Sequence, residues 1–183
     1  MDLRNHFLIP APGHSHTLFD NALVYVCDHN ERGALGLIVN RPIHLTVAKI
    51  LEHSEVTVQD TDLANAPVYM GGPVQLERGF VLHCPPGEWK STLNLTDSLG
   101  LTTSRDILDA INEGTGPENA LIILGYAGWE AGQLEEEIGH NFWLNVPADS
   151  KILFDFPPAE RLKAAVRQLG VEWYRIAPTV GHA

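Results

Sequence analysis

The chain has 183 residues, a formal net charge of −11 and a sequence pI near 5.1. Its 44% apolar and 19% charged residues are ordinary values for a globular protein and exclude a disordered chain. Nucleic-acid affinity depends on clustered cations, and the twelve Lys and Arg residues form no run, so the charge argues against a nucleic-acid partner. No apolar stretch reaches the roughly 18 residues of a membrane span, and we expect a cytoplasmic protein without a membrane partner.

Short β-rich runs bounded by turn residues predict most of a sheet. In chain order they are Leu23–Asp28, Ala34–Asn40, Pro67–Met70, Gly79–His83, Leu93–Leu95, Leu99–Thr102, Ala120–Leu124, Phe142–Val146 and Lys151–Phe154. A polar segment that ends in glycine joins the first two runs, as is typical of a β-hairpin. The run Ala120–Leu124 is apolar throughout, which favours a central strand covered on both faces.

Apolar faces and capping residues predict three helices, and a fourth is expected to open with Glu130. Thr46 is a good N-cap for a helix that ends near His53, and Thr103 is a good N-cap for the second helix. The third helix begins around residues 157–158, and Gly170 follows its last turn. Because strands outnumber helices and do not alternate strictly with them, we expect an α+β fold with a mixed sheet. No linker divides the chain, so residues 1–183 are expected to form a single domain.

The segment Gly125–Gln133 follows the predicted central strand, where phosphate-binding loops commonly lie. Its glycines have the spacing GxxGxxxG, whereas a dinucleotide-binding turn needs GxGxxG and a P-loop needs a Lys followed by Ser or Thr. The expected helix opens with Glu130, whose carboxylate repels an anion. We therefore interpret the glycines as a tight turn for packing and Trp129 as a core residue.

The patterns that could bind a metal are weak. His14-Ser15-His16 is the one close pair of histidines, and two ligands without a neighbouring carboxylate do not make a zinc site. Cys27 and Cys84 lie far apart in apolar stretches, which indicates buried thiols. The run Glu135–Glu137 is typical of a solvated helix face. We expect neither a metal nor another cofactor.

Four motifs together resemble the AlgH/YqgE family of small bacterial proteins. They are HNERGALGLIVNRP (29–42), YMGGPVQLERGFVLH (69–83), LGYAGWEAGQLEEEI (124–138) and GHA (181–183). The resemblance implies a cytosolic α+β protein with a curved, mixed, mostly antiparallel sheet that forms a pseudo-barrel flanked by helices. Family members commonly carry the label of transcriptional regulators associated with alginate control. The family supplies no established catalytic set.

The first functional hypothesis is a non-catalytic binding or regulatory protein that acts indirectly, through an unknown protein or small-molecule partner. Its candidate ligand-binding residues are Asn40, Arg41, Gly71, Gly72, Arg78, Gly125, Trp129 and Gln133.

The second hypothesis is an enzyme that acts on a small anionic substrate. Arg41 and Arg78 would clamp the anion, and His83 or Glu135 would serve as the general acid or base. The third hypothesis, a direct DNA-binding regulator, ranks last because the sequence contains no basic recognition helix.

Overall fold

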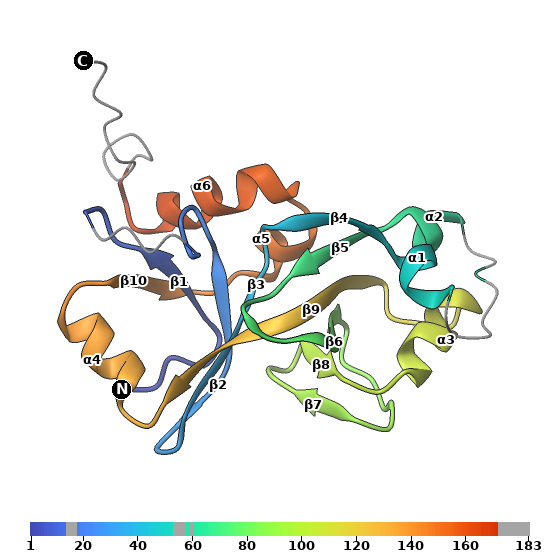
Figure 1. Cartoon of the computed structure of the whole chain (residues 1–183), viewed down its shortest axis with the longest axis horizontal. Coiled ribbons are helices and arrows are strands. Elements are labelled where there is room, and N and C mark those ends of the chain that lie inside the picture. The colour runs from blue at the N-terminus through green and yellow to red at the C-terminus, as the bar shows by residue number, and fades with distance from the viewer. Residues whose placement is uncertain (14–17, 53–57, 59–60, 172–183) are drawn as a thin grey trace, which may run out of the picture. The chain divides into compact units, whose positions relative to one another are not determined.

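The computed structural model describes residues 1–13, 18–52, 58 and 61–171. The described residues form ten strands, which are β1 (His6–Pro10), β2 (Val24–Asn30), β3 (Gly33–Ile38), β4 (Pro42–Thr46), β5 (Pro67–Met70), β6 (Val74–Cys84), β7 (Thr92–Asn94), β8 (Gly100–Thr102), β9 (Asn119–Glu130) and β10 (Trp143–Pro147). The same residues form six helices, which are α1 (Val47–Leu51), α2 (Thr61–Asn65), α3 (Asp106–Asn112), α4 (Gln133–Gly139), α5 (Ser150–Phe154) and α6 (Pro158–Gln168). The fold is α+β with a mixed, mostly antiparallel sheet, as the family resemblance implied (Figure 1).

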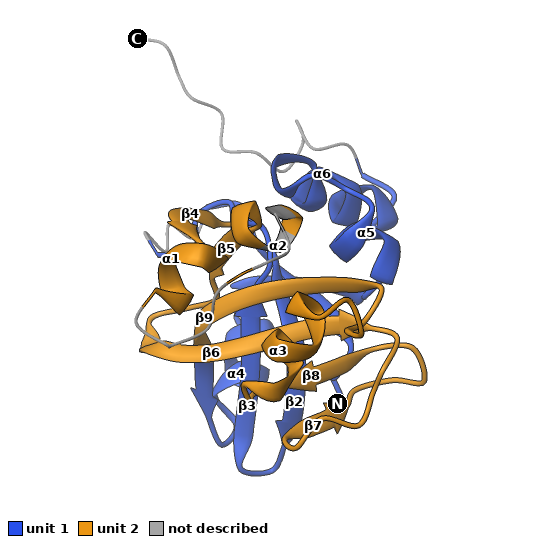
Figure 2. Cartoon of the chain, turned by 90° about the vertical axis from the view of Figure 1, so that its right-hand side faces the viewer, with its two compact units in different colours: residues 1–40, 128–183 blue, residues 41–127 orange. Residues whose placement is uncertain are grey.

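The chain divides into two compact units (Figure 2). Unit 1 comprises residues 1–40 and 128–183, and unit 2 comprises residues 41–127. Strand β9 contributes to both units, because the division falls within it after Ala127. The expectation that the whole chain forms one domain stays a prediction.

Unit 1 is built on an antiparallel sheet. Its strand order is β10-β1-β2-β3, followed by the end of β9. β2 and β3 form the predicted hairpin, with a bulge between Val26 and Asp28. Helix α6 contacts β1, and its buried Arg161 donates hydrogen bonds to the backbone carbonyls of Phe156 and Val39. The bond to Val39 ties α6 to the residue that follows β3.

Unit 2 places β9 between two strands that run in opposite directions. β5 pairs with β9 in parallel, with Val68 opposite Ile122, while β6 pairs antiparallel, with Val81 opposite the same Ile122. β8 and β7 extend the sheet beyond β6, and β4 pairs with β5. The apolar cluster of this unit consists of Val47, Leu51, Val68, Val81, Ile107 and Ile122.

The connection from β5 to β6 has to cross β9. Neighbouring strands lie about 4.8 Å apart, so the chain travels roughly 10 Å from one side of β9 to the other. Only Gly71-Gly72-Pro73 separates the two strands, and four extended steps reach about 14 Å, so the backbone runs directly across β9. A Cβ atom on Gly71 would lie 2.3 Å from the Gly125 carbonyl oxygen, and one on Gly72 would lie 2.1 Å from the Tyr126 carbonyl carbon. We call Gly71, Gly72 and Gly125 the glycine crossing.

The predicted turn over Gly125–Gln133 is wrong for most of its length. Strand β9 continues as far as Glu130, and only Ala131 and Gly132 form the turn before α4. Glycine usually weakens a strand, but here Gly125 takes a φ of +73° where the crossing segment packs on it. Gly125 is therefore needed for tertiary packing within a strand, although the local sequence pattern assigned it to a turn.

Two further predictions of secondary structure are wrong. The run Lys151–Phe154 lies in helix α5 and not in a strand, because the Asp149 carboxylate accepts a hydrogen bond from the first N–H of the run and caps a helix. Helix α3 begins at Asp106, three residues after the predicted cap Thr103. The Ser104 hydroxyl instead donates to the Asp106 carboxylate and orients it at the start of the helix.

Three predicted features lie outside the described residues: the helix end at His53, the pair His14 and His16, and the motif at 181–183. Among the helices that the structure does describe, none has the length and apolar character to cross a membrane.

We predict that Gly72→Ala destabilises the chain by about 1–3 kcal/mol, since the added methyl group overlaps the Tyr126 backbone. Gly139→Ala is the matched control, because a Cβ there has no atom within 4 Å and alanine favours a helix. Denaturant unfolding followed by tryptophan fluorescence measures both changes. Equal stability of the two variants would contradict the crossing as a packing constraint.

Candidate functional site

The glycine crossing brings together four of the predicted binding residues, all from unit 2. The N–H of Gly71 donates to the Leu124 carbonyl at 2.8 Å, and the Arg41 carbonyl accepts from the residue before Gly71 at 2.9 Å. Gly72 and Gly125 complete the contact through their backbones. Arg41, Gly71, Gly72 and Gly125 therefore meet at one place, although through backbone atoms that serve packing.

Directly after the crossing, β6 bulges away from β9. Val74 pairs with Tyr126 and Gly79 pairs with Leu124, so residues 75–78 lie opposite a single residue of β9. We call residues 75–78 the β6 bulge. All four of its residues are exposed, which makes the bulge a projection of the strand at the place where predicted binding residues converge.

The β6 bulge contains an exposed apolar side chain and a cation that lies over two aromatic rings. Leu76 is 55% exposed. The guanidinium carbon of Arg78 lies 5.2 Å from the centre of the Phe80 ring and 6.0 Å from that of Tyr126, which is a favourable cation–π arrangement. Gln75 adopts a φ of +46°, a left-handed backbone conformation that residues other than glycine and asparagine rarely adopt. Arg78 was predicted from the sequence and Leu76 was not, although a single apolar residue within a polar strand segment is a signal that could have indicated it.

In unit 1, the predicted residue Gln133 belongs to a hydrogen-bond network centred on Glu137. Two indole N–H groups donate to the same Glu137 oxygen, from Trp129 at 2.9 Å and from Trp143 at 2.7 Å. The Gln133 amide donates to the other oxygen at 2.9 Å, and its own oxygen accepts from the Glu130 N–H. Glu137 is therefore a structural anchor of α4, whereas the acidic run Glu135–Glu137 had been interpreted as a solvated helix face.

Trp129 and Asn40 have structural contacts in unit 1. Trp129 is 7% exposed, and its ring lies so close to Gly36 that a Cβ there would be 3.0 Å away. Asn40 accepts a hydrogen bond from the Leu23 N–H and donates to the Asn21 carbonyl, each at 2.8 Å. The indole N–H of Trp129 is bonded to Glu137, and the Asn40 amide links two backbone segments of unit 1, so both side chains serve the fold.

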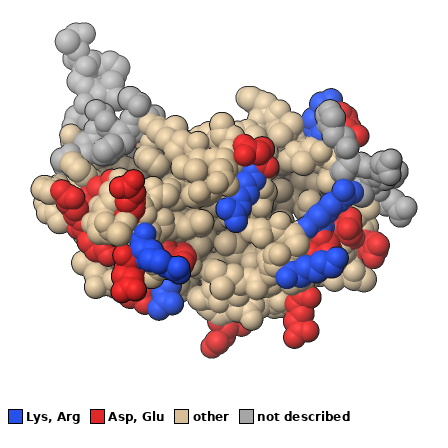
Figure 3. Space-filling model, turned by 60° about the horizontal axis from the view of Figure 1, so that its bottom comes forward, with Lys and Arg blue, Asp and Glu red and all other residues tan. Residues whose placement is uncertain are grey.

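Glu135, a predicted acid or base, is paired with a buried histidine of β2. The Leu3 N–H donates to His29 Nδ1 at 3.1 Å, so the ring carries its proton on Nε2 and donates it to Glu135 at 2.8 Å. The backbone N–H of Glu135, followed by the His29 N–H, lowers the pKa of this carboxyl, and burial partly offsets the shift. Glu135 stays ionised and holds α4 against β2. Figure 3 shows acidic side chains gathered at the end that carries α4, with basic ones beside them.

His83, the other predicted acid or base, has no exposed surface. Nδ1 donates to the Pro85 carbonyl at 3.0 Å, so Nε2 accepts from the Thr102 hydroxyl at 2.8 Å. The ring also packs edge-on against Trp89 and faces Gly100. A buried ring with both nitrogens bonded within the protein has no access to a substrate. We therefore do not retain His83 as an acid or base.

No metal ligands gather in the described part of the chain, since no three His, Cys, Asp or Glu side chains come together there. Cys27 is buried, and burial raises the pKa of its thiol, which keeps the sulfur protonated. Cys84 is half-buried.

Comparisons with known proteins agree with one another. A family profile described as AlgH-like matches residues 7–174. A UPF0301 protein of Dechloromonas aromatica is 52% identical over 183 residues, which cover 100% of this chain and 98% of that protein. A UPF0301 protein of Azoarcus is 50% identical over 182 residues, which cover 100% of this chain and 97% of that protein.

Two solved structures have a similar fold. The solution structure of AlgH from Pseudomonas aeruginosa matches with a TM-score of 0.84 and 48% identity, and covers 100% of this chain and 97% of that one. A crystal structure of a Corynebacterium diphtheriae protein matches with a TM-score of 0.71, over 91% of this chain and 87% of that one. Its identity of 18% shows a common fold alone.

We predict that Glu137→Gln destabilises unit 1 by about 1–3 kcal/mol, because an amide cannot accept from both indoles and Gln133 through two oxygens. Glu136→Gln, an exposed position one residue earlier, should change stability by less than about 0.5 kcal/mol. Unfolding in denaturant measures both variants. A loss of the same size in each would mean that charge alone, and not the indole network, is responsible.

We predict that His83 makes the chain less stable at acidic pH. Burial lowers the pKa of His83, against a smaller opposite effect of its bond to Pro85, so the unfolded chain binds a proton that the folded chain refuses. Stability contributed by His83 is therefore complete above about pH 6.5 and falls as the pH drops toward the lowered pKa. His83→Gln should flatten the change in unfolding free energy between pH 7 and pH 5, whereas the exposed His140→Gln should not. Parallel curves for wild type and His83→Gln would refute this.

Proposed function

The chain belongs to the AlgH-like family, and from that premise we propose that it is a non-catalytic binding protein whose β6 bulge contacts a protein partner. The observation that carries the proposal is that the four-residue β6 bulge holds both the 55% exposed Leu76 and Arg78, whose guanidinium lies over the rings of Phe80 and Tyr126. Arginine and tyrosine are enriched in the energetic centres of protein interfaces, and here the exposed Arg78 lies over the half-buried ring of Tyr126 and the buried ring of Phe80.

The glycine crossing supports this proposal because it fixes the base of the bulge. Binding is weakened when loops and side chains must become ordered on contact. Here Gly72 and Gly125 pack backbone on backbone, and Arg78 is held by the two rings and by a 3.5 Å bond to Gln75. A partner would therefore meet a largely preorganised surface. Its matching chemistry is an apolar recess for Leu76 and a carboxylate for Arg78.

A binding role also fits what the predicted acid and base groups do. His83 is buried and bonded through both nitrogens, and Glu135 is paired with His29. Their contacts hold elements of the fold in place. With a net charge of −11, any effect on transcription would be indirect, through the bound partner, because DNA phosphates repel such a protein.

We predict that Leu76→Asp weakens partner binding about tenfold. The full-length chain, this variant and Leu93→Asp are each immobilised and used to capture proteins from a bacterial lysate, which are then quantified by mass spectrometry. Leu93 is the matched control, because it is 54% exposed and lies on β7, outside the bulge. Proteins captured by the wild type should fall about tenfold with Leu76→Asp, the loss expected for one interface anchor, and persist with Leu93→Asp.

Four outcomes would overturn the proposal. Equal losses with both aspartate variants would indicate non-specific adhesion to exposed leucines, and unchanged capture with Leu76→Asp would remove the bulge as the contact surface. Turnover of any compound in a metabolite panel by the purified chain would show an enzyme. Salt-dependent binding of a DNA duplex, absent from a charge-matched control protein, would favour direct regulation.

A further inference from the structure

A small open pocket lies on the β2–β3 hairpin of unit 1, and its lining includes none of the residues that the proposed function uses. It has a volume of about 240 Å³, below the roughly 300–1,000 Å³ of pockets for drug-sized ligands. Its polar side chains are Asp28, Asn30 and Arg32. The rest of the lining comes from Gly33, Ala34, Leu35 and Trp129. The size of the pocket suits a molecule as small as a free amino acid.

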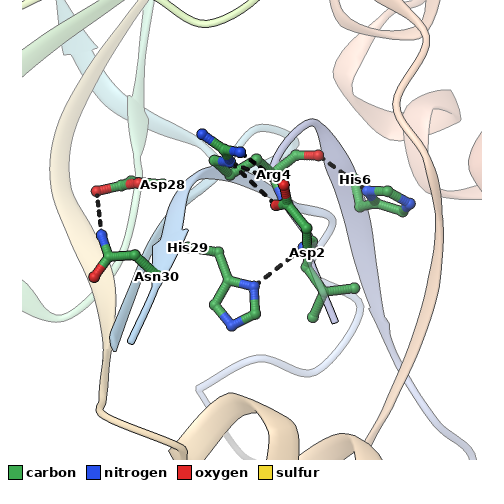
Figure 4. A network of polar contacts seen from close by, with 7 residues as sticks. Asp2, Arg4, His6, Asp28, His29 and Asn30 are labelled. Atoms are coloured by element: carbon green, nitrogen blue, oxygen red, sulfur yellow. Dashed lines mark hydrogen bonds and ion pairs between the residues drawn. The ribbon is translucent and has the colours of Figure 1, made fainter. Parts of the chain in front are cut away.

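Asp28 and Arg32 give this pocket one negative and one positive group. Figure 4 shows Asp28 and Asn30 pointing to the same side of the hairpin, while His29 points to the other. Arg32 follows at the exposed turn, and no partner of its guanidinium is found in the part of the chain that the structure describes. A simple anion would be repelled by Asp28, and a simple cation by Arg32. The pair is complementary to a ligand that carries both charges.

Asn30 holds the two charged residues in a fixed relation. Its amide nitrogen donates to one oxygen of Asp28 at 3.1 Å, and its oxygen accepts from the Arg32 N–H at 2.8 Å. One amide therefore orients the carboxylate and sets the turn from which the guanidinium projects. Such support from a neighbouring side chain is what keeps polar groups of a binding site in place.

The nearby N-terminal segment leaves the Asp28 charge available. Arg4 is the other cation close by, but it is held by Asp2 through bonds of 2.7 Å to 3.2 Å (Figure 4). Arg4 also attracts Asp28 through its charge, but among the described residues it forms its ion pair with Asp2. Asn30 bonds one Asp28 oxygen, so the second oxygen can accept from a ligand.

We propose that this pocket binds a small zwitterion of the amino-acid class. The ammonium group of the ligand donates to the Asp28 carboxylate, and the carboxylate of the ligand accepts from the Arg32 guanidinium. The open rim admits side chains of different length, so the pocket recognises the charged main-chain groups of an amino acid and not a particular side chain.

The test uses the ¹⁵N-labelled full-length chain and three probes that differ by one charge. L-alanine carries both charges, N-acetyl-L-alanine lacks the ammonium group, and L-alaninamide lacks the carboxylate. At millimolar concentrations, L-alanine should shift the amide signals of residues 28–35 and bind about tenfold more tightly than either analogue, the difference expected for one charge-assisted hydrogen bond.

Variants of the two charged residues assign the contacts. Asp28→Asn should remove the preference for L-alanine over N-acetyl-L-alanine, and Arg32→Gln should remove its preference over L-alaninamide. Arg167→Gln, an exposed arginine of α6, should change neither preference. The Leu76→Asp variant should bind L-alanine as the wild type does, because Leu76 is not part of the pocket lining. The pocket and the proposed function can therefore fail independently.

Equal affinity for the three probes, shifts confined to residues outside 28–35, or preferences unchanged by Asp28→Asn and Arg32→Gln would each overturn the proposal. The comparison of probes on the wild-type chain is decisive by itself, so it does not depend on whether a variant folds. A dispersed spectrum of each variant confirms that a lost preference reflects the missing charge.

Discussion

The crossing of the β5–β6 connection over β9 is the constraint on which unit 2 depends. Two neighbours of one strand, running in opposite directions, are joined by three residues, and the connection therefore has no room for side chains where it passes over the backbone of β9. The same constraint explains why β6 is irregular immediately afterwards. The chain pairs once with Tyr126, leaves β9 for four residues, and resumes regular pairing at Gly79. The β6 bulge is a consequence of this path.

The sequence predicted the strands on either side of the crossing more reliably than the contact between the crossing segment and Gly125. Gly71-Gly72-Pro73 was correctly interpreted as a separator of two strands, since glycine and proline have local preferences that are readable one segment at a time. Gly125 was misassigned to a turn, because its role is set by the backbone of residues 71 and 72, about fifty positions earlier in the chain. Periodicity and capping describe local structure, and neither contains this long-range contact.

The three glutamates at the start of α4 show the same limit for side chains. As a pattern they predict a solvated face, and Glu136 conforms to it. Glu135 instead accepts from His29, and Glu137 accepts from the indoles of Trp129 and Trp143. The partners lie on β2, β9 and β10, so what distinguishes three identical residues is the tertiary surroundings. The prediction of Trp129 as a core residue was correct because a large aromatic side chain is favoured in a core almost wherever its strand lies.

The two candidate surfaces differ in the kind of recognition that their chemistry permits. The β6 bulge projects, so its contacts need a partner that supplies the concave side, and only a macromolecule can enclose Leu76 and reach Arg78 together. The hairpin pocket is concave and carries its own pair of opposite charges, so a ligand of a few atoms can satisfy it. In both places local contacts hold polar groups in position before binding. Aromatic rings lie under Arg78, and the Asn30 amide bonds both the Asp28 carboxylate and the Arg32 N–H. In the β6 bulge this preorganisation is accompanied by a strained backbone at Gln75. Because the charged groups are held in place before contact, they favour ligands or partners whose groups match their positions.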